Sequence, residues 1–358
     1  MAGIYIHIPF CKKRCLYCDF FSTTILERQE EYMKAVVREL EMRQDEIGEP
    51  IETIYIGGGT PSTLPIRLII GLNKVITPFN NREFTMEINP GDVTEDYLNG
   101  LREIGINRLS IGIQSFQDEL LQRIGRRHNA EQAIKAVQMA QKAGFKNISI
   151  DLMYALPTQT IQQWRADIKT AINLKVQHIS SYGLMYEEGT ILTKQLESGE
   201  IKAIDEETEN AMYDLLCEQM KKAGFVHYEV SNFALPGYES KHNSNYWNGT
   251  PYIGIGAGAH SFVNNVRSWN PSDLDAYING INDGTLVQES ENLTEKDLYN
   301  EHIMLGLRTC RGISRKEIKA DLEHWINNNM VRETEDGRIV ATQNGLHILN
   351  LIIEELMI

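Results

Sequence analysis

Six short apolar segments alternate with stretches of helical periodicity up to about residue 185, and this alternation limits the possible folds more than any other feature. The first segment shows the pattern most clearly, because Ile4, Ile6 and Ile8 alternate with Tyr5 and His7 as on the two faces of a strand. Six strands that each precede a helix predict an α/β fold with a parallel sheet, either curled into a βα barrel or open and doubly wound. The predicted strands are 4–8, 51–56, 84–90, 107–116, 147–157 and 177–185.

Glycine follows three of the amphipathic stretches, at Gly105, Gly144 and Gly224, and the next residue is apolar each time. A glycine in this place suits the left-handed backbone that ends many helices, and the apolar residue then starts a buried strand. We therefore expect helices to end at these three positions.

The rhythm changes after about Glu188. A helix near 206–222 and one strand over 225–233 lead to a loop and then to the stretch HNSNYWNGTPYIGIGAGAHS at 242–261. The last segment is predicted to be a small α-rich module with a hairpin that turns at Asp336-Gly337, a combination that resembles a winged helix. Its predicted helices are 294–308, 314–328 and 344–356, and its hairpin is 331–342.

Charge and composition exclude several classes of protein. The net charge is −14, and the last segment (292–358) holds 8 Lys and Arg against 11 Asp and Glu, which argues against nucleic acid or an anionic membrane as the main partner. We expect no signal peptide, because the start MAGIYIHI has no charged region, and no apolar run approaches the ~18 residues of a membrane span. Five cysteines, three of them clustered, fit a reducing compartment, so we expect a cytoplasmic protein.

Three of the cysteines, Cys11, Cys15 and Cys18, follow the first strand directly in a C-x3-C-x2-C spacing. Three thiolates on one loop can converge on one metal centre, and a 4Fe–4S cluster with three cysteine ligands keeps one iron open for another ligand. The basic run 12–14 is expected to favour thiolate over thiol.

Other roles for these cysteines remain open. Zinc would need a fourth protein ligand, which His7 or Asp19 could supply. A disulfide would leave one thiol over, and the spacing also matches one face of a helix with packed, apolar cysteines. We favour the iron–sulfur cluster, because zinc sites usually show paired short cysteine spacings.

The cysteine motif, together with the flanking YIHIPFC (5–11), resembles radical S-adenosylmethionine (SAM) enzymes, in particular the anaerobic coproporphyrinogen III oxidase family with its HemW-type heme-chaperone branch. The resemblance covers almost the whole chain. It implies an open six-stranded (β/α)6 barrel, less fully closed than the eight-stranded form. We accordingly predict a radical SAM barrel over 1–190, an accessory α/β region over 191–291 and the winged-helix-like C-terminal module over 292–358.

Polar residues recur where the predicted strands end. GGGTP (57–61) follows the second strand, and its glycines would let the backbone approach a ligand and expose amide hydrogens, although a plain tight turn is the simpler interpretation. Glu87, Gln114 and Asp151 lie on three later strands, where a buried polar side chain is costly unless it is paired. They predict one polar pocket, unless each merely caps or anchors a loop.

The resemblance implies SAM contacts for a defined set of residues. Tyr5 is similar to the position near the methionyl carboxylate, and Tyr17 to the aromatic position that contacts adenine. Radical SAM proteins use such a cluster to cleave SAM reductively, with the chemistry carried by the cofactors. The other implied SAM-binding residues are Gly58, Gly59, Thr60, Glu87, Gln114, Arg126 and Asp151.

Two features favour the heme-chaperone branch over the oxidases. The oxidases resemble C-x3-C-x2-C-x-C, whereas this chain has Phe20 at the last position, and they carry a longer segment before the first strand. HNSNYW also resembles the H-N-x-x-Y-W of the chaperone branch, so His242 is the expected axial ligand of heme iron, with Tyr246 and Trp247 against the macrocycle. A surface loop anchored by two aromatic residues is the plainer alternative.

Three further residues have weaker assignments. GIGAGAHS (254–261) resembles the second glycine-rich stretch of the family, near SAM, and makes His260 a lesser candidate for a heme ligand. Cys217 and Cys310 lie in helical patterns and are expected to be buried, apolar side chains.

The sequence thus predicts a heme chaperone that holds a 4Fe–4S cluster, SAM and heme, receives electrons from a donor and delivers heme to an acceptor protein. Contact with a membrane is expected only through that acceptor. The alternatives are an oxygen-independent coproporphyrinogen III oxidase and a winged-helix regulator that uses the cluster as a sensor. No basic recognition helix supports the regulator.

Overall fold

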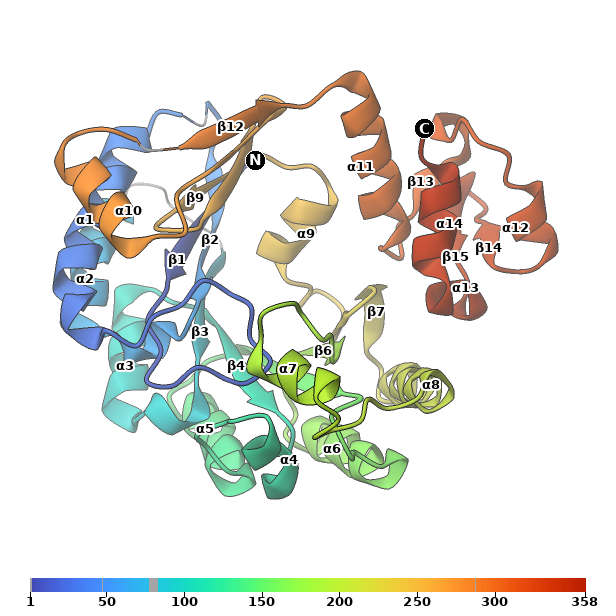
Figure 1. Cartoon of the computed structure of the whole chain (residues 1–358), viewed down its shortest axis with the longest axis horizontal. Coiled ribbons are helices and arrows are strands. Elements are labelled where there is room, and N and C mark those ends of the chain that lie inside the picture. Colours follow the sequence, from blue (N-terminus) through green and yellow to red (C-terminus); the bar gives the residue numbers. More distant parts are fainter. Residues whose placement is uncertain (1, 47, 77–82, 287) are drawn as a thin grey trace.

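The computed structural model describes residues 2–46, 48–76, 83–286 and 288–358, and its centre is a curled parallel sheet (Figure 1). The six predicted strands are present, adjacent and parallel in chain order, so the predicted (β/α)6 fold is confirmed. They are β1 (Ala2–Ile8), β2 (Ile51–Gly58), β3 (Glu83–Ile88), β4 (Arg108–Gln114), β5 (Asn147–Tyr154) and β6 (His178–Gly183).

Helices form an outer layer around these strands (Figure 1). Ile4, Ile6 and Ile8 of β1 are completely buried in the apolar layer between strands and helices, as the alternation predicts. Gly105, Gly144 and Gly224 all adopt positive φ where a helix ends, so the predicted helix ends are confirmed. The helices are α1 (Gln29–Arg43), α2 (Ile66–Ile76), α3 (Glu95–Ile104), α4 (Asp118–Arg123), α5 (Ala130–Lys142) and α6 (Ile161–Asn173), with short 3-10 turns at Leu26–Arg28, Pro61–Thr63 and Pro90–Asp92.

The sheet continues beyond these six strands at both edges and has twelve strands in all among the described residues. At one edge, β8 (Asn232–Ala234) pairs antiparallel with β6, and β7 (Val226–Glu229) pairs antiparallel with β8. The prediction of one strand over 225–233 is therefore wrong, because the chain turns at Val230-Ser231 and pairs with itself. The other edge holds β9 (Tyr252–Ile255), which lies parallel to β1, and then β10 (His260–Val263), β11 (Val266–Trp269) and β12 (Glu289–Asn292).

Four helices accompany these outer strands. HNSNYW forms the helix α9 (Lys241–Trp247) and not the surface loop of the plainer alternative, and the Ser240 hydroxyl caps this helix by accepting from the amide of Asn243. The others are α7 (Ile191–Glu197), α8 (Glu206–Lys222) and α10 (Leu274–Asn282).

The C-terminal module has its own apolar core, which includes Ile303, Trp325 and Ile352, and its own three-stranded sheet. The predicted hairpin is confirmed, with Gly337 at positive φ in its turn. The predicted helix 314–328 is wrong, since Ile318 is extended and only a 3-10 turn and a short helix form there. The elements are α11 (Glu295–Leu307), β13 (Ile313–Ser314), a 3-10 turn (Arg315–Glu317), α12 (Glu323–Asn327), β14 (Val331–Glu333), β15 (Arg338–Ala341), α13 (Gln343–His347) and α14 (Leu349–Leu356), the last two replacing the single predicted helix 344–356.

The described helices include none with both the length and the apolar character that a membrane crossing requires. The predicted boundaries near 190 and 291 stay predictions. The twelve-stranded sheet contains strands that lie before residue 190 and strands that lie after it.

Candidate functional site

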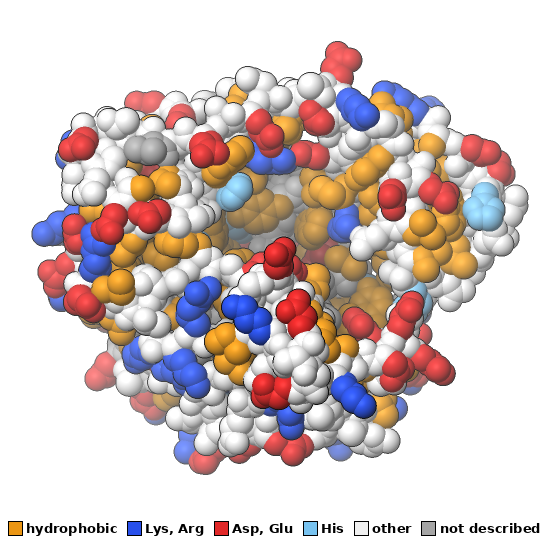
Figure 2. All heavy atoms as spheres, in the orientation of Figure 1, with side chains coloured by type: hydrophobic (Ala, Val, Ile, Leu, Met, Phe, Trp, Pro, Cys, Tyr) orange, Lys and Arg blue, Asp and Glu red, His pale blue; other side chains and the backbone are white. Residues whose placement is uncertain are grey.

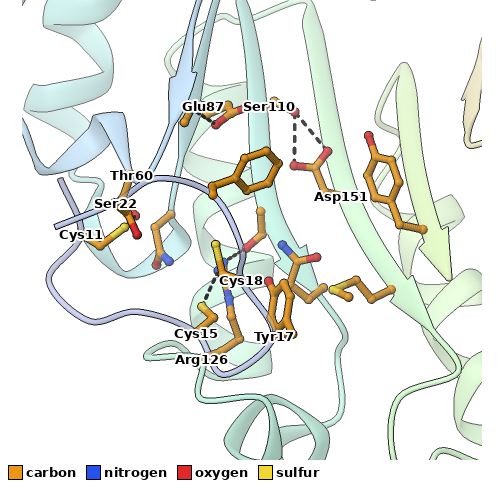
Figure 3. Close-up of a pocket in the computed structure, with 18 of the residues that line it drawn as sticks. Cys11, Cys15, Tyr17, Cys18, Ser22, Thr60, Glu87, Ser110, Arg126 and Asp151 are labelled. Carbon is orange, nitrogen blue, oxygen red and sulfur yellow. Dashed lines mark hydrogen bonds between the residues drawn. The ribbon is translucent and has the colours of Figure 1, made fainter. Parts of the chain in front are cut away.

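A cavity of about 480 Å³ opens where the parallel strands end, and most of the predicted site residues line it (Figure 3). The loop after β1 and residues of β2 to β6 supply most of the lining, as expected for a parallel βα fold. The loop after α4 adds Arg126 and Arg127, and α9 adds Asn243. Figure 2 shows that the face in view is hollowed near its centre and that hydrophobic side chains gather there. The predicted residues in the lining are Cys11, Cys15, Tyr17, Cys18, Gly58, Gly59, Thr60, Glu87, Gln114, Arg126 and Asp151.

The cysteine loop is fixed to the barrel at several points. The amide of Cys11 donates to the carbonyl of Thr23 over 2.8 Å, which closes the loop on itself. The Cys11 Sγ lies 3.3 Å from the Thr60 hydroxyl, and Arg126 Nη1 lies 3.5 Å from the Cys15 Sγ (Figure 3). Thiols from one end of the chain are thus held against β2 and against the loop that follows α4.

The environment of the thiols differs from the expectation. Burial raises the pKa of Cys11, and burial likewise raises the pKa of Cys18 to about 11. Lys12, the first residue of the basic run, is paired with Asp92, with 2.8 Å between its Nζ and the Asp92 Oδ1. The predicted preference for thiolate is therefore wrong for Cys11 and Cys18, and a metal that binds them must displace their protons.

The donor set fits an iron–sulfur cluster better than zinc. Each cysteine thiolate binds a different iron of a four-iron cluster, so the three cysteines surround the cluster instead of meeting at one point. Within the described ranges, no three His, Cys, Asp or Glu side chains gather closely enough for a single ion. His7, the proposed fourth zinc ligand, has its Nε2 2.9 Å from the Phe21 carbonyl oxygen and its Nδ1 3.1 Å from the Tyr5 hydroxyl.

Two carboxylates form the polar part of the cavity. Glu87 accepts hydrogen bonds from the Tyr55 hydroxyl at 2.8 Å and from the amide of Gly58 at 3.1 Å. Asp151 accepts one from the Ser110 hydroxyl at 3.1 Å (Figure 3). Burial raises the pKa of Asp151, and it raises the pKa of Glu87 to about 7. Two buried acids of this kind favour a ligand that carries positive charge.

Three buried polar atoms around the cavity have no hydrogen-bond partner among the described residues. They are the Ser22 hydroxyl, Arg108 Nε and Arg126 Nε, and all three residues line the cavity. Such atoms are costly unless a ligand or water satisfies them. Donors beside two acids fit a molecule that carries a carboxylate together with positive charge. SAM, with its carboxylate, amine and sulfonium groups, is a molecule of this kind.

The glycine turn after β2 has a different role from the one predicted. The amides of Gly58, Gly59 and Thr60 donate to Glu87, to the Ile8 carbonyl and to the Phe10 carbonyl, so they are not free for a ligand. A Cβ at Gly58 would lie 2.6 Å from the His7 ring, and φ there is 109°. These glycines let β2 and the cysteine loop pack closely, and they line the cavity through their backbone.

Gln114 reaches the cavity through an irregularity in β4. The pairing of β4 with β5 shifts register between Gly112 and Gln114, as in a β-bulge. Gln114 itself has φ 71°, a left-handed conformation that is uncommon for residues other than glycine. Backbone strain of this kind concentrates at functional sites.

Two predicted residues do not line the cavity. Tyr5 lies in the barrel interior, stacked on Tyr55 with 6.2 Å between ring centroids. His242 is 1% exposed, and its Nδ1 and Nε2 each lie 2.9 Å from a hydroxyl oxygen, those of Thr53 and Tyr246. Burial lowers its pKa to about 3. The ring lies near the start of β2 and β3, whereas the cysteines lie where the strands end, and its assignment as a heme ligand stays a prediction.

The residues with weaker assignments in the sequence analysis also lie outside the cavity. GIGAGAHS does not line the cavity, and the Gly256 amide instead donates to the buried Glu39. His260 is exposed and stacks on Trp269. Cys217 is half-buried, and Cys310 is exposed because α11 ends at Leu307, so the prediction of a buried Cys310 is wrong.

Several lining residues were missed by sequence reasoning. Arg108 and Ser110 lie on β4 two residues apart and so face the same side, a polar alternation that could have revealed them. Phe20, with 62% of its surface exposed, and Met185, with 69%, are apolar residues that also line the cavity. Nothing in the local sequence indicates that Met185 would lie there.

SAM binding is expected to depend on pH through Glu87. Below pH 7 this carboxyl takes up a proton and loses its attraction for a cation, so affinity should rise with pH through about 7. If only the ionised form binds, the dissociation constant should grow by about 20- to 30-fold from pH 7.5 to 5.5. Calorimetric titration of the cluster-loaded protein with SAM measures this.

Glu87→Gln isolates the effect, because the amine of SAM titrates equally with both proteins. It should bind SAM more weakly at pH 7.5 and lack the part of the pH dependence that belongs to Glu87. Glu103→Gln, at an exposed position on α3, should behave as the unmodified protein. Equal pH profiles for Glu87→Gln and the unmodified protein would exclude Glu87 as the titrating group.

Comparison with known proteins extends these observations. Residues 5–171 match the family model described as the radical SAM superfamily. The heme chaperone HemW of Bacillus subtilis (strain 168) is 38% identical over 324 residues, which cover 88% of this chain and 86% of that protein. The heme chaperone HemW of Lactococcus lactis subsp. lactis (strain IL1403) is 34% identical and covers 99% of this chain and 97% of its own.

A solved structure supports the fold. The radical SAM enzyme coproporphyrinogen III oxidase (HemN) of Escherichia coli superposes with a TM-score of 0.85 and covers 99% of this chain and 90% of that chain. Sequence identity is 22%. At that identity, the likeness shows a shared architecture and no more.

Proposed function

This chain belongs to the radical SAM superfamily and, within it, to the HemW family of heme chaperones, and on this basis we propose that it binds heme and passes it to a heme-accepting protein. The similarity to curated heme chaperones along nearly the full length of both chains carries this proposal. Membership of the superfamily implies a 4Fe–4S cluster and SAM as cofactors.

The cavity supplies the residues for these cofactors. Cys11, Cys15 and Cys18 would hold the cluster, and the two acids with Arg126 would bind and orient SAM. When both are bound, the cluster and SAM supply the reductive cleavage of the sulfonium, with an electron from a separate donor. Phe20 and Met185 would limit the access of water to the bound groups.

We place this activity in the cytoplasm, where the free thiols described above stay reduced. The partners are heme, its acceptor and an electron donor. The net charge of −14 disfavours nucleic acid, and the C-terminal module is better suited to a protein or a small molecule than to DNA. Contact with a membrane would come through the acceptor.

One residue favours the chaperone over a coproporphyrinogen III oxidase. The oxidases resemble C-x3-C-x2-C-x-C, and this chain has Phe20 at the position of the last cysteine. It lines the cavity beside the three cysteines, so an apolar ring takes the place of a thiol there. Decarboxylation of a porphyrinogen is the competing function, and the test must measure both.

The purified protein should bind about one heme per chain, seen as a shifted Soret band on titration with hemin. It should transfer that heme to an apo-b-type cytochrome faster than serum albumin, a passive carrier, does. With SAM and a reductant under anaerobic conditions it should convert little or no coproporphyrinogen III. Rapid decarboxylation without heme binding would favour the oxidase and overturn the proposal.

A further inference from the structure

A second cavity, of about 610 Å³, lies between the barrel and the C-terminal module, away from the cysteine loop. Its walls come from the end of α9, from β9 to β11, and from α11 and β15 of the module. Figure 1 shows α9 and α11 next to each other at this junction. The volume falls within the roughly 300–1,000 Å³ typical of small-molecule and cofactor sites. We call this cavity the α9–α11 groove.

One wall of the groove is aromatic. Tyr246 and Trp247 of α9 line it together with Tyr252 of β9 and Phe262 of β10, and all four are half-buried. Tyr246 and Tyr252 meet edge to face with their centroids 4.7 Å apart, which fixes their orientation. Rings held in this way offer an apolar surface suited to a flat ligand.

The opposite wall is a face of α11. Ile303 and Leu307 of this helix are buried in the core of the module. Leu298, His302 and Leu305 lie at spacings of four and three residues, so they share another face, and that face lines the groove. A histidine thus stands between two leucines, opposite an aromatic wall.

The His302 ring is available to bind a metal. Its side chain is 47% exposed, and its Nε2 lies 3.3 Å from a carboxylate oxygen of Glu317. In the part of the chain that the structure describes, its Nδ1 has no hydrogen-bond partner. Histidines that bind metals usually pair their other ring nitrogen with such a carboxylate, which orients the ring. His242, by contrast, is buried with both nitrogens occupied.

Two arginine side chains, Arg311 and Arg338, also line the groove. Arg311 is exposed and lines it, and no ion pair links its guanidinium to another described residue. Arg338 also lines it and donates to the carbonyls of Arg311 and Gly312. A guanidinium without a carboxylate partner suits a ligand with carboxylate groups at its edge.

We propose that the α9–α11 groove is the heme site and that His302 is the axial ligand of the iron. A flat apolar body, a central metal and carboxylates at the edge describe heme, and the groove offers a surface for each. This assignment rests on the proposed function and specifies its site. It also gives HNSNYW two ends with separate roles, since His242 anchors α9 in the barrel while Tyr246 and Trp247 face the groove.

Titration of single variants with hemin tests the proposal. His302→Ala should weaken heme binding about tenfold or more and change the Soret band, because the iron loses a ligand. Adding free imidazole to His302→Gly should restore the original spectrum, which a merely structural histidine would not allow. His324→Ala is the matched control, because His324 is another exposed histidine of the module and does not line the groove.

A second variant tests the contact with the carboxylates. Arg311→Ala should weaken binding of heme and leave binding of heme dimethyl ester, which has no free carboxylates, unchanged. An unaltered Soret band and affinity in His302→Ala would overturn the proposal and leave the chaperone function intact. Failure of the unmodified protein to bind heme at all would instead remove the proposed function.

Discussion

Replacing Cys11, Cys15 and Cys18 together by alanine is expected to abolish cluster binding. The unmodified protein, reconstituted anaerobically with iron and sulfide, should hold about four irons and four sulfides per chain. The triple variant should hold almost none, because the remaining two thiols, Cys217 and Cys310, do not line the cavity. Iron and sulfide analysis together with the absorption spectrum measures this.

The same two cysteines provide the control. Cys217→Ala combined with Cys310→Ala should leave the iron and sulfide content unchanged. Hemin titration of the triple variant adds a second comparison, because the α9–α11 groove is lined by other residues and should still bind heme. Full iron loading in the triple variant would refute the assignment of the cluster ligands.

Glu39→Ala is expected to destabilise the fold strongly. The Glu39 side chain is completely buried and pairs with Arg43 at 3.1 Å. It also accepts hydrogen bonds from Asn270 Nδ2 at 2.8 Å, the Tyr277 hydroxyl at 2.7 Å and the Gly256 amide at 2.8 Å. Removing it leaves the Tyr277 hydroxyl and the Gly256 amide without their acceptor, and each buried donor left unsatisfied typically costs about 1–3 kcal/mol. Arg43 loses one carboxylate but keeps its ion pair with Glu46, and Asn270 keeps its bond to the Gly256 carbonyl.

Chemical denaturation of the cluster-free protein, followed by circular dichroism, measures the change in stability. Glu31→Ala provides the control on the same helix, because Glu31 is exposed and its pair with Arg28 should contribute only about 0–1 kcal/mol. Equal denaturation midpoints for the two variants would mean that the buried pair does not stabilise the fold.

The parts of the fold that the sequence predicted correctly depend on local patterns. The alternation in β1 and the glycine at the end of each helix involve neighbours in the chain, so they are visible without a structure. The position of the cavity also followed from topology, because parallel strands place their ends at one edge. Eleven of the predicted cofactor and metal residues therefore lie in one cavity.

Residues whose partners are distant in the chain could not be placed from the sequence. His242 contacts Thr53, and Glu39 contacts Asn270, and no local pattern reports such pairs. A glutamate beside an apolar helical stripe is normally exposed, which is why Glu39 carried no signal. The helix predicted at 314–328 failed for a related reason. Ile318, Leu322 and Trp325 have helical spacing and are all buried, but an irregular segment carries two of them into the core.

The position of β1 within the sheet has a consequence for synthesis of the protein. Its two edges pair with β2 and with β9, which follow it by about fifty and about two hundred and fifty residues. At roughly 5–20 residues per second, some ten to forty seconds separate the emergence of these partners from the ribosome. Until then the strand that carries the cysteine loop has one unpaired edge, which invites pairing with other nascent chains.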